Sequence, residues 1–589
     1  MSAFCMNHKV FHILDKNDGA IMPQEEICRN RIISENYRDF IVNQLRGNIF
    51  DSISSEELCE QSMEYLYKTI YVDGTMADPI NFEKYAYNSV PKCFTLIDTE
   101  ALSQSGILQI QNYPTLGLKG NGVLVGFIDT GIDYENPVFR NIDGSTRILG
   151  IWDQSIQDGQ PPQNFLYGTE YTKEMIDAAL SSDNPKALVP TQDESGHGTF
   201  LASVAAGGAD VENQFLGAAP ESKLAIVKLK PAKKYLKEFY LITEEKECYQ
   251  ENDIMLGMRY LNELANQYDM PLVICIALGS NMGGHNATLP ITGLLEIYAN
   301  IANRAVVIGG GNEANQRHHF YGKSENVNDI KKAEIRVDSG MKGFTMELWT
   351  DIPNIVAVSI ISPSGERIPR VPIRREVTEV YRFVFEGTTI FINYKLLVEK
   401  SNSELIFFRV KDPAPGIWTI FIEPVELADG VFHMWLPVTE LLEGEVYFLQ
   451  SNPDYTITEP GSTVSGMTVG YYNGDDNSIA IRSGRGYTRS EKIKPDFVAP
   501  GVNVTGAAMR NQFTERTGSS VAVGITAGAV ALMLEWIVYQ LGESGIDSIQ
   551  IRNLLVLGTD HKPGETYPNR EWGYGALNLY DAFDAIRRI

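Results

Sequence analysis

The hydrophobic positions between residues 120 and 312 form runs of two alternating kinds. The run 123–131 (VLVGFIDTG) is almost continuously apolar until it ends in a polar turn, which predicts a strand buried on both faces. Similar runs occupy 223–230, 271–280 and 305–312. Segments with helical spacing lie around them, at 196–208, 253–268 and 294–304. Strands that alternate with helices in this way predict an α/β fold, a parallel sheet with helices on both faces.

The pattern changes between about residues 325 and 480. This stretch holds short strand-like pieces separated by Gly, Pro, Asp and Asn, among them TMELWT, NIVAVSII, ELIFFRV and GIWTIFIE. Such pieces predict an inserted all-β sandwich. Helical spacing returns at 518–541. Its apolar run, 521–534, is shorter than the ~20 residues that cross a bilayer, so it predicts a buried helix.

The first hundred residues have mixed patterns. Residues 56–67 have helical spacing and 69–74 alternate as a strand does, which together indicate a small α+β unit. The whole chain therefore divides into an N-terminal unit (1–99), a first part of the α/β domain (100–324), the sandwich (325–480) and a second part of the α/β domain (481–589).

Charge narrows the choice of partners. The chain of 589 residues carries 50 Lys+Arg and 75 Asp+Glu, a formal net charge of −25. A nucleic-acid binder needs a basic footprint, and an anionic membrane attracts basic segments. We therefore expect neither a nucleic acid nor a membrane as partner.

Cysteine spacing and the first residues bear on the compartment. No two of the six cysteines form a CxxC pair, and they are sparse for a disulfide framework, so we expect free thiols in a reducing compartment. They are Cys5, Cys28, Cys59, Cys93, Cys248 and Cys275. The opening MSAFCMNHKVFHILDKNDGA has no apolar core of a secretory signal peptide.

Three motifs place reactive side chains at the ends of predicted strands or the starts of predicted helices. Asp129 lies in Asp-Thr-Gly after the first buried strand, His197 in Gly-His-Gly-Thr, and Ser520 in Gly-Ser-Ser-Val-Ala. A serine hydroxyl needs an adjacent base to become a nucleophile, and that base needs an orienting group. Ser, His and Asp fill these roles in any chain order. Asn312, in Gly-Gly-Gly-Asn-Glu after another strand, supplies an amide N–H for an oxyanion.

These motifs, in this order, resemble those of the subtilisin-like serine proteases (subtilases). The wider match is similar to the clostridial branch that includes the Csp-type spore-germination proteases. Five segments of the α/β region carry this resemblance: 118–155, 193–207, 311–320, 494–501 and 572–578. Segments 34–42 and 96–107 resemble the propeptide of that branch and its join to the mature chain.

The resemblance implies a serine endopeptidase made as a self-processing zymogen. Asp129, His197 and Ser520 match the catalytic triad and Asn312 the oxyanion asparagine, while Gly524 replaces a proline common in the family. The implied substrate-pairing residues are Leu278, Gly279, Ser280 and Gly310, and the implied processing region is Thr99, Glu100 and Ala101. Residues 1–99 would be an N-terminal extension and propeptide, which in this branch can stay bound in the cleft after cleavage, and the sandwich would be jelly-roll-like. The implied substrate is a polypeptide, for which a spore cortex-lytic pro-enzyme is one candidate.

Other interpretations stay open at this point. A latent scaffold acting by partner binding is the main alternative, and carbohydrate binding by the sandwich is another. We expect no cofactor and no metal, although loop 141–144 with Asp143 is a candidate calcium site of the kind some subtilases have. The pair His318 and His319 indicates a surface or cleft-rim role, and His285 a structural one.

Two further expectations concern class and location. Aspartic proteases use two Asp-Thr/Ser-Gly motifs, and this chain has such motifs at Asp129 and Asp338. The fold of those proteases is all-β, however, whereas Asp129 follows a strand of a predicted βαβ unit. The missing signal peptide predicts a cytoplasmic or spore-associated protein, with non-standard export left open.

Overall fold

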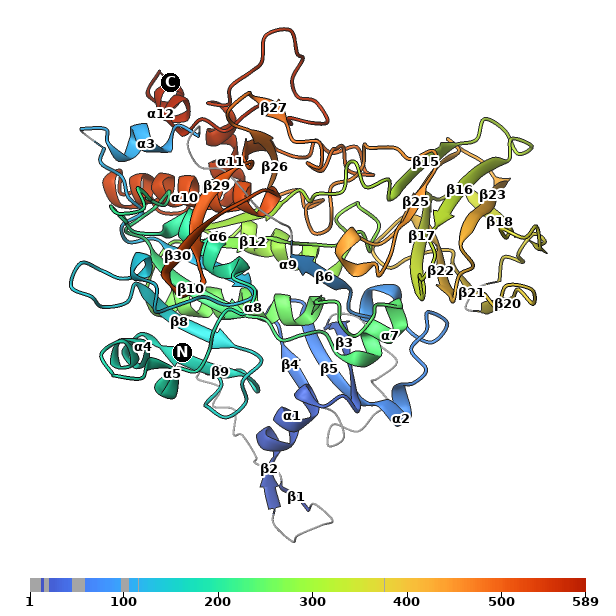
Figure 1. Ribbon diagram of the computed structural model, residues 1–589, viewed down its shortest axis with the longest axis horizontal. Coiled ribbons are helices and arrows are strands. Elements are labelled where there is room, and N and C mark those ends of the chain that lie inside the picture. The colour runs from blue at the N-terminus through green and yellow to red at the C-terminus, as the bar shows by residue number, and fades with distance from the viewer. Residues whose placement is uncertain are drawn as a thin grey trace, which may run out of the picture.

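A nine-stranded sheet forms the centre of the molecule in the computed structural model, which describes residues 12–14, 21–44, 59–96, 105–114, 116–374 and 377–588 (Figure 1). Its order is β27-β26-β14-β12-β7-β10-β8-β9, with β28 beside β26. The strands are β7 (Leu124–Asp129), β8 (Ile148–Asp153), β9 (Thr169–Thr172), β10 (Lys223–Lys228), β12 (Leu272–Ile276), β14 (Arg304–Gly309), β26 (Met467–Asn473), β27 (Ser478–Ile479) and β28 (Phe497–Pro500). Only the pairs β8–β9 and β26–β27 are antiparallel, so the predicted α/β class is confirmed.

Helices cover both faces of this sheet because its strands are apolar on both sides. In β7, Leu124 packs into one core and Val125 into the other. The first core includes α8 (Glu251–Gln267) and α9 (Pro290–Ala299), and the second includes α6 (His197–Ala206), α10 (Ser519–Leu534) and α11 (Ser548–Val556). The remaining helices of this region are α3 (Ile107–Gln111), α4 (Lys173–Leu180), α5 (Pro185–Leu188), α7 (Lys234–Tyr240) and α12 (Leu579–Arg588).

Helix α10 is the buried helix that the sequence predicts. All of its residues are buried. Together with the π-helical turn η5 (Glu535–Gln540) it spans 22 residues and is apolar enough to cross a membrane by composition, yet it packs inside the protein. Gly528 permits this close packing, since a Cβ there would lie 2.2 Å from the Cβ of Ala218.

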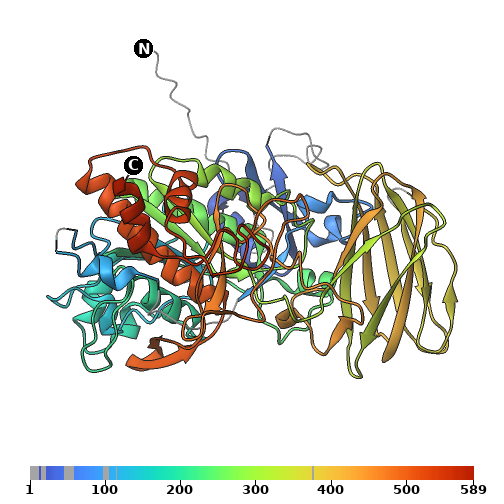
Figure 2. The ribbon, with the colours of Figure 1, turned by 90° about the horizontal axis from the view of Figure 1, so that it is seen from above.

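The inserted region is an antiparallel sandwich at the far end of the long axis, as Figure 2 shows. One sheet has the order β15-β24-β17-β22-β21-β20 and the other β19-β18-β23-β16-β25. The strands are β15 (His319–Lys323), β16 (Lys331–Val337), β17 (Gly343–Asp351), β18 (Ile355–Ile361), β19 (Arg367–Ile368), β20 (Thr378–Arg382), β21 (Thr389–Lys395), β22 (Ser403–Lys411), β23 (Gly416–Glu426), β24 (Val431–Trp435) and β25 (Val446–Phe448). Strand β26, which falls inside the expected range 325–480, belongs to the parallel sheet.

The N-terminal unit contains a small sheet with the order β3-β5-β4 and the helices α1 and α2. Its elements are β1 (His12–Leu14), β2 (Ile21–Pro23), α1 (Gln24–Ile33), β3 (Tyr37–Asn43), β4 (Cys59–Ser62), β5 (Tyr67–Asp73) and α2 (Gly74–Ala77). The predicted strand at 69–74 is confirmed, but the helix predicted over 56–67 is wrong. Residues 59–62 pair with β5, and their inward and outward side chains alternate. Strand pairing overrides the local spacing there.

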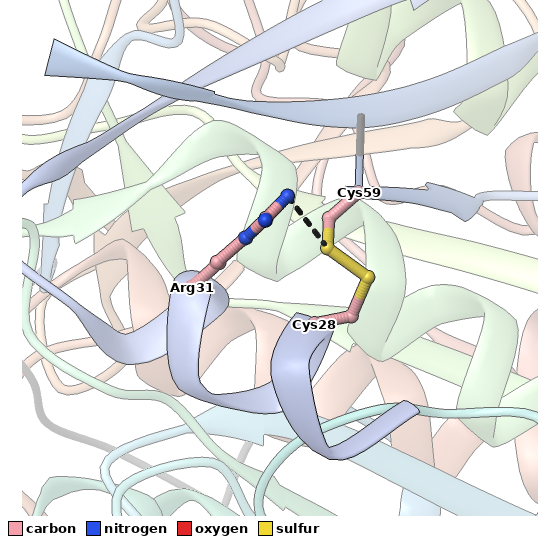
Figure 3. Close-up of a disulfide and its surroundings, with 3 residues drawn as sticks. All are labelled: Cys28, Arg31 and Cys59. Atoms are coloured by element: carbon pink, nitrogen blue, oxygen red, sulfur yellow. Dashed lines mark hydrogen bonds between the residues drawn. A yellow bond between two sulfur atoms is a disulfide. The ribbon is translucent and has the colours of Figure 1, made fainter. Parts of the chain in front are cut away.

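A disulfide joins Cys28 of α1 to Cys59 of β4, with their Cα atoms 5.4 Å apart (Figure 3). The Arg31 guanidinium lies beside it, with Nη1 3.8 Å from the Cys59 sulfur. The expectation of free thiols is therefore wrong for this pair, because folding brings together two cysteines whose spacing of 31 residues signals nothing. Cys93, Cys248 and Cys275 are buried free thiols, and Cys5 lies outside the described residues. The argument for a reducing compartment is lost, and localisation stays a prediction.

Candidate active site

Asp129, His197 and Ser520 meet in one hydrogen-bonded row. His197 Nδ1 lies 2.7 Å from Asp129 Oδ1, and His197 Nε2 lies 3.2 Å from Ser520 Oγ. All three side chains are buried. The histidine therefore has one ring nitrogen on a carboxylate and the other on a hydroxyl, as a base that activates a nucleophile requires.

Each of these side chains sits at the end of an element. Asp129 is the last residue of β7, His197 is the first of α6, and Ser520 is the second of α10. The carboxyl ends of parallel strands share one edge of the sheet, where open α/β sheets bind ligands. The start of α10 also brings its backbone N–H groups and the positive end of its dipole to this edge.

Asp193, which the sequence analysis did not single out, holds the aspartate loop against the histidine helix. Its carboxylate accepts the N–H groups of Gly196 and Thr199 at 2.9 and 2.8 Å, and the Thr199 hydroxyl at 2.8 Å. It also accepts the Thr130 hydroxyl at 2.8 Å. Thr130 follows Asp129, and Gly196 precedes His197. The buried Asp193 carboxylate therefore fixes a residue next to each member of the Asp129–His197 pair. An acidic residue just before a predicted helix start was the available signal.

Gly198 is a second residue that the sequence analysis passed over. A Cβ on Gly198 would lie 2.2 Å from the carbonyl oxygen of Gly131. Its N–H donates to the Thr130 hydroxyl at 3.0 Å. The helix can therefore approach the Asp129 loop only with glycine after the histidine, which explains the Gly-His-Gly motif.

Asn312 lies in the turn that follows β14, and its amide is oriented by the start of α10. The Asn312 Oδ1 accepts the Ser519 N–H at 3.1 Å. The other end of the amide, Nδ2, is the donating end. Asn312 is also buried. The turn thus brings an amide donor to the helix start that carries Ser520.

The residues expected to pair with substrate separate into two groups. Leu278 and Gly279 form β13, which pairs antiparallel with β6 (Cys93–Leu96) of the N-terminal unit. Leu278 is opposite Leu96 and Gly279 is opposite Thr95. A further strand, β11 (Tyr249–Gln250), pairs with the other edge of β6. The end of the N-terminal unit therefore occupies the strand position expected for an extended polypeptide.

The backbone N–H and carbonyl groups of Ser280 and Gly310, in contrast, form hydrogen bonds within the α/β domain. The Ser280 N–H donates to Glu459 and its carbonyl accepts the Glu459 N–H, at 3.0 and 2.8 Å. The Gly310 N–H donates to Val469 at 2.9 Å, and its carbonyl accepts from Thr458 at 3.2 Å. Thr99, Glu100 and Ala101 lie outside the described residues.

The histidines of the segment after Asn312 are buried, so a surface position of His318 and His319 is wrong, while the alternative of a cleft-rim role stays a prediction. His318 Nδ1 lies 2.6 Å from Glu313 Oε2, whereas His319 Nε2 lies 3.0 Å from Nδ1 of His433 in the sandwich. His285 stacks on Trp435 with ring centroids 4.1 Å apart, as a structural histidine does. His319 begins β15, so this segment enters the sandwich and is buried there, which the local sequence does not reveal.

Burial and charge shift several pKa values around the site. Burial raises the pKa of Asp133, which accepts the Arg510 N–H at 2.9 Å. Burial and, secondarily, the charge of Asp129 raise the pKa of the Cys275 thiol. This cysteine is therefore a neutral core residue and not a second nucleophile.

Two alternative sites receive no geometric support. Asp338 follows β16 in the sandwich and lies 3.5 Å from Arg336, whereas Asp129 contacts His197. Asp143 accepts the N–H and hydroxyl of Ser145 at 3.0 and 2.6 Å. Within the described ranges, no three or more His, Cys, Asp or Glu side chains gather in a way that could hold a metal ion. Calcium binding stays a prediction.

Comparison with known proteins places this geometry in a family. Residues 120–403 and 444–575 match the model of the Subtilase family of peptidases. The solved structure of the CspB protease of Clostridium perfringens superposes with a TM-score of 0.73 and 28% identity, covering 82% of this chain and 98% of that one.

Curated relatives match over shorter stretches of their own length. The serine protease AprX of Bacillus subtilis is 32% identical over 149 residues, which are 22% of this chain and 32% of AprX. The C5a peptidase of Streptococcus pyogenes serotype M1 is 21% identical over 486 residues, 74% of this chain and 37% of that protein. The chain thus spans about a third of these relatives.

Proposed function

This chain belongs to the subtilase family of serine peptidases, and we propose that it is an endopeptidase that cleaves polypeptides with Ser520 as its nucleophile. The observation that carries the proposal is the row Asp129–His197–Ser520, with contacts of 2.7 and 3.2 Å. Hydrolysis of a peptide bond needs a nucleophile, a base and an oxyanion donor in one place. The start of α10 supplies the nucleophile, the start of α6 the base, and the turn after β14 the amide donor.

The proposed reaction follows from these contacts. Ser520 Oγ attacks the scissile carbonyl while His197 Nε2 takes its proton. Asp129 holds the Nδ1–H tautomer and stabilises the imidazolium. Asn312 Nδ2 and the Ser520 N–H donate to the oxyanion, and His197 then protonates the leaving amine. Water repeats these steps on the acyl-enzyme. The chain's own residues handle every proton and charge, so the proposed reaction uses no cofactor.

We propose that the first substrate is the chain itself. Strand β6 ends at Leu96 beside β13, while Ser105 accepts the Leu579 N–H at 3.0 Å, at the start of α12. The connection between these anchored points is 97–104, which includes the predicted processing region at Thr99, Glu100 and Ala101. A cut there would release the join and leave β6 on β13.

The N-terminal unit is expected to stay bound after this cut. Asp39 of β3 forms a buried ion pair with Lys233 at 2.5 Å. The Lys92 N–H donates to Glu251 of α8 at 3.1 Å. Removing one partner of a buried ion pair is costly, so the unit should leave slowly. This occupancy is also what favours the alternative function, a latent protein that acts by partner binding.

The natural substrate is proposed as a polypeptide in extended form. The resemblance to the Csp-type branch makes a spore cortex-lytic pro-enzyme the candidate to test first. Cleavage of such a pro-enzyme by the wild type but not by Ser520→Ala would support this candidate substrate. Absence of cleavage by the wild type would exclude it.

A serine-directed fluorophosphonate tests the proposed nucleophile. The label is irreversible, so it accumulates even when the cleft opens only part of the time. We expect it on Ser520 in the wild type, by peptide mass mapping, and not in His197→Ala. The matched control is Ser519→Ala, which should label like the wild type. Equal labelling in wild type and His197→Ala, or labelling of another residue, would contradict the proposal.

A further inference from the structure

A hairpin that precedes Ser520 brings an arginine to the edge of the candidate active site. Strands β29 (Val504–Ala508) and β30 (Gln512–Arg516) form this hairpin, and Arg516 is its last residue, four positions before Ser520. Arg516 Nη2 donates to the Ser195 carbonyl at 3.2 Å. A Cβ on Gly196 would lie 3.3 Å from the same nitrogen. The guanidinium therefore lies against the two residues that precede His197.

The hairpin is held in this place from both of its ends. At its turn, the Arg510 N–H donates to Asp133 at 2.9 Å. The Met509 sulfur lies 3.8 Å from the Thr199 hydroxyl oxygen. At the other end, the Arg516 guanidinium lies over the Phe200 ring, 5.5 Å from its centroid. These contacts fix Arg516 beside α6, the helix that carries His197.

The reaction itself indicates on which side of the scissile bond Arg516 lies. The acyl half of a substrate lies with the oxyanion donor and the pairing strand, here Asn312 and β13. The leaving half receives its proton from the histidine and so lies on the His197 side. Arg516 contacts the residues just before His197, which puts its charge beside the leaving half.

The charge of Arg516 has no counter-ion in the described part of the chain. No Asp or Glu oxygen of the described residues lies within 4.0 Å of its nitrogens. Arg510, at the hairpin turn, likewise makes no ion pair there. The hairpin holds Arg510, Glu515 and Arg516, a net charge of +1, whereas the chain as a whole carries −25. A half-buried guanidinium in such a place favours a carboxylate partner.

We propose that Arg516 selects polypeptides with an acidic residue within the first positions after the cut bond. This proposal rests on the proposed endopeptidase function and adds a substrate preference to it. The chain's own processing region agrees in sequence, since 97–101 reads Ile-Asp-Thr-Glu-Ala. A cut after Ile97 or Thr99 would place Asp98 or Glu100 first in the leaving half.

Self-processing of the full-length chain with exchanged charges tests the proposal. The processing rate is followed by intact mass in four chains: wild type, Arg516→Glu, the pair Asp98→Lys with Glu100→Lys, and the combination of all three changes. We expect each partial change to slow the cut about fivefold, the size that a partly exposed ion pair supplies, and the combination to recover most of the wild-type rate. The losses should shrink at high salt.

Control variants make each outcome decisive. Arg510→Glu makes the same charge change at the exposed turn of the same hairpin and should process at close to the wild-type rate. Ser520→Ala, which should stay whole, shows that the measured cut is the chain's own. If Arg516→Glu is processed at the wild-type rate, the proposed role of Arg516 is overturned. The same holds if the chain with all three changes is processed no faster than the chains with the partial changes. Neither result bears on self-processing itself. No cut in any chain, or equal cutting of Ser520→Ala, overturns the proposed self-processing as well.

Discussion

Ser519 and Ser520 are neighbours of the same residue type in different surroundings. Ser520 Oγ faces His197 Nε2 at 3.2 Å. Ser519 Oγ is buried, with no hydrogen-bond partner among the described residues, and its N–H donates to Asn312. The Gly-Ser-Ser motif contains both serines, and the predicted nucleophile Ser520 is the one that faces the histidine. The same chain therefore supplies a matched control for every test of the nucleophile.

Replacement of Asn312 tests the oxyanion donor. Asn312→Asp keeps the shape of the side chain but removes the N–H donor, and Asn312→Ala removes the whole amide. Because the donor acts on the transition state, we expect both changes to lower kcat by about 10²–10³, the known effect in a subtilisin, with little change in KM. Steady-state kinetics on one peptide substrate measures this. An unchanged kcat in Asn312→Asp would show that the Asn312 amide does not stabilise the oxyanion.

Replacement of Gly198 tests the close approach between the start of α6, which carries His197, and the loop that follows Asp129. In Gly198→Ala the new methyl group would collide with the Gly131 carbonyl, 2.2 Å from its position, and push His197 away from Asp129. We expect self-processing to slow by at least about a hundredfold, because a displacement near 1 Å has this cost in catalysis. Gly444→Ala, whose added Cβ would be 3.7 Å from Met341, is the matched control. Equal rates in both variants would show that this contact is not needed.

The elements of the α/β domain were largely predictable because each carries its own signal. The continuous apolar runs became β7, β10, β12 and β14, and the helical runs became α6, α8 and α9. Cys28 and Cys59 carried no such signal, since their contact depends on how α1 packs against β4. The covered position of His318, and the internal backbone partners of Ser280 and Gly310, likewise depend on segments distant in sequence.

The disulfide is expected to stabilise the N-terminal unit. It closes a loop with a sequence separation of 31, which restricts the unfolded chain by about 3–4 kcal/mol in the chain-entropy account. In a Ser520→Ala background, Cys28→Ser with Cys59→Ser should speed amide hydrogen exchange in β3 and β5 but not in β7. Cys275→Ser is the control for loss of a buried thiol. Unchanged exchange in β5 would contradict the stabilising role.

The contact between the sandwich and the α/β domain should weaken in acid. Burial lowers the pKa of His285 to about 4 and of His319 to about 3, and it lowers the pKa of His433 well below its usual value. These histidines are neutral when folded but titrate near pH 6.5 when unfolded, so their contribution to stability falls as pH drops from about 6.5 toward 4. For His285 the full loss is about 3 kcal/mol. Burial raises the pKa of Glu459 to about 7, which opposes this trend.

A difference between variants isolates the histidine contribution. Melting temperatures at pH 7.5 and 5 are compared for Ser520→Ala with and without His285→Gln. We expect the drop in acid to be smaller in His285→Gln, because this variant has no proton to gain on unfolding at that position. His561→Gln, at an exposed histidine, should drop like its parent. A drop that is the same in all three chains would contradict the burial argument.

At the scale of the whole molecule, the N-terminal unit contacts both other parts. Tyr87 donates its hydroxyl to Glu347 of the sandwich at 2.8 Å, and the Lys92 N–H reaches Glu251 of α8. Figure 1 shows this unit below the junction of the two parts. Glu347 also accepts the Gly283 N–H of the α/β domain at 3.0 Å. All of the parts therefore meet at one buried carboxylate, which supports retention of the N-terminal unit after a cut.

The proposed function depends above all on Ser520 cutting its own chain. The measurement that tests it most directly is the intact mass of the purified wild type beside Ser520→Ala and Ser519→Ala. We expect two fragments for the wild type and Ser519→Ala, divided within 97–104 and eluting together, and one whole chain for Ser520→Ala. A whole wild-type chain, or a Ser520→Ala chain divided at the same place, would contradict it.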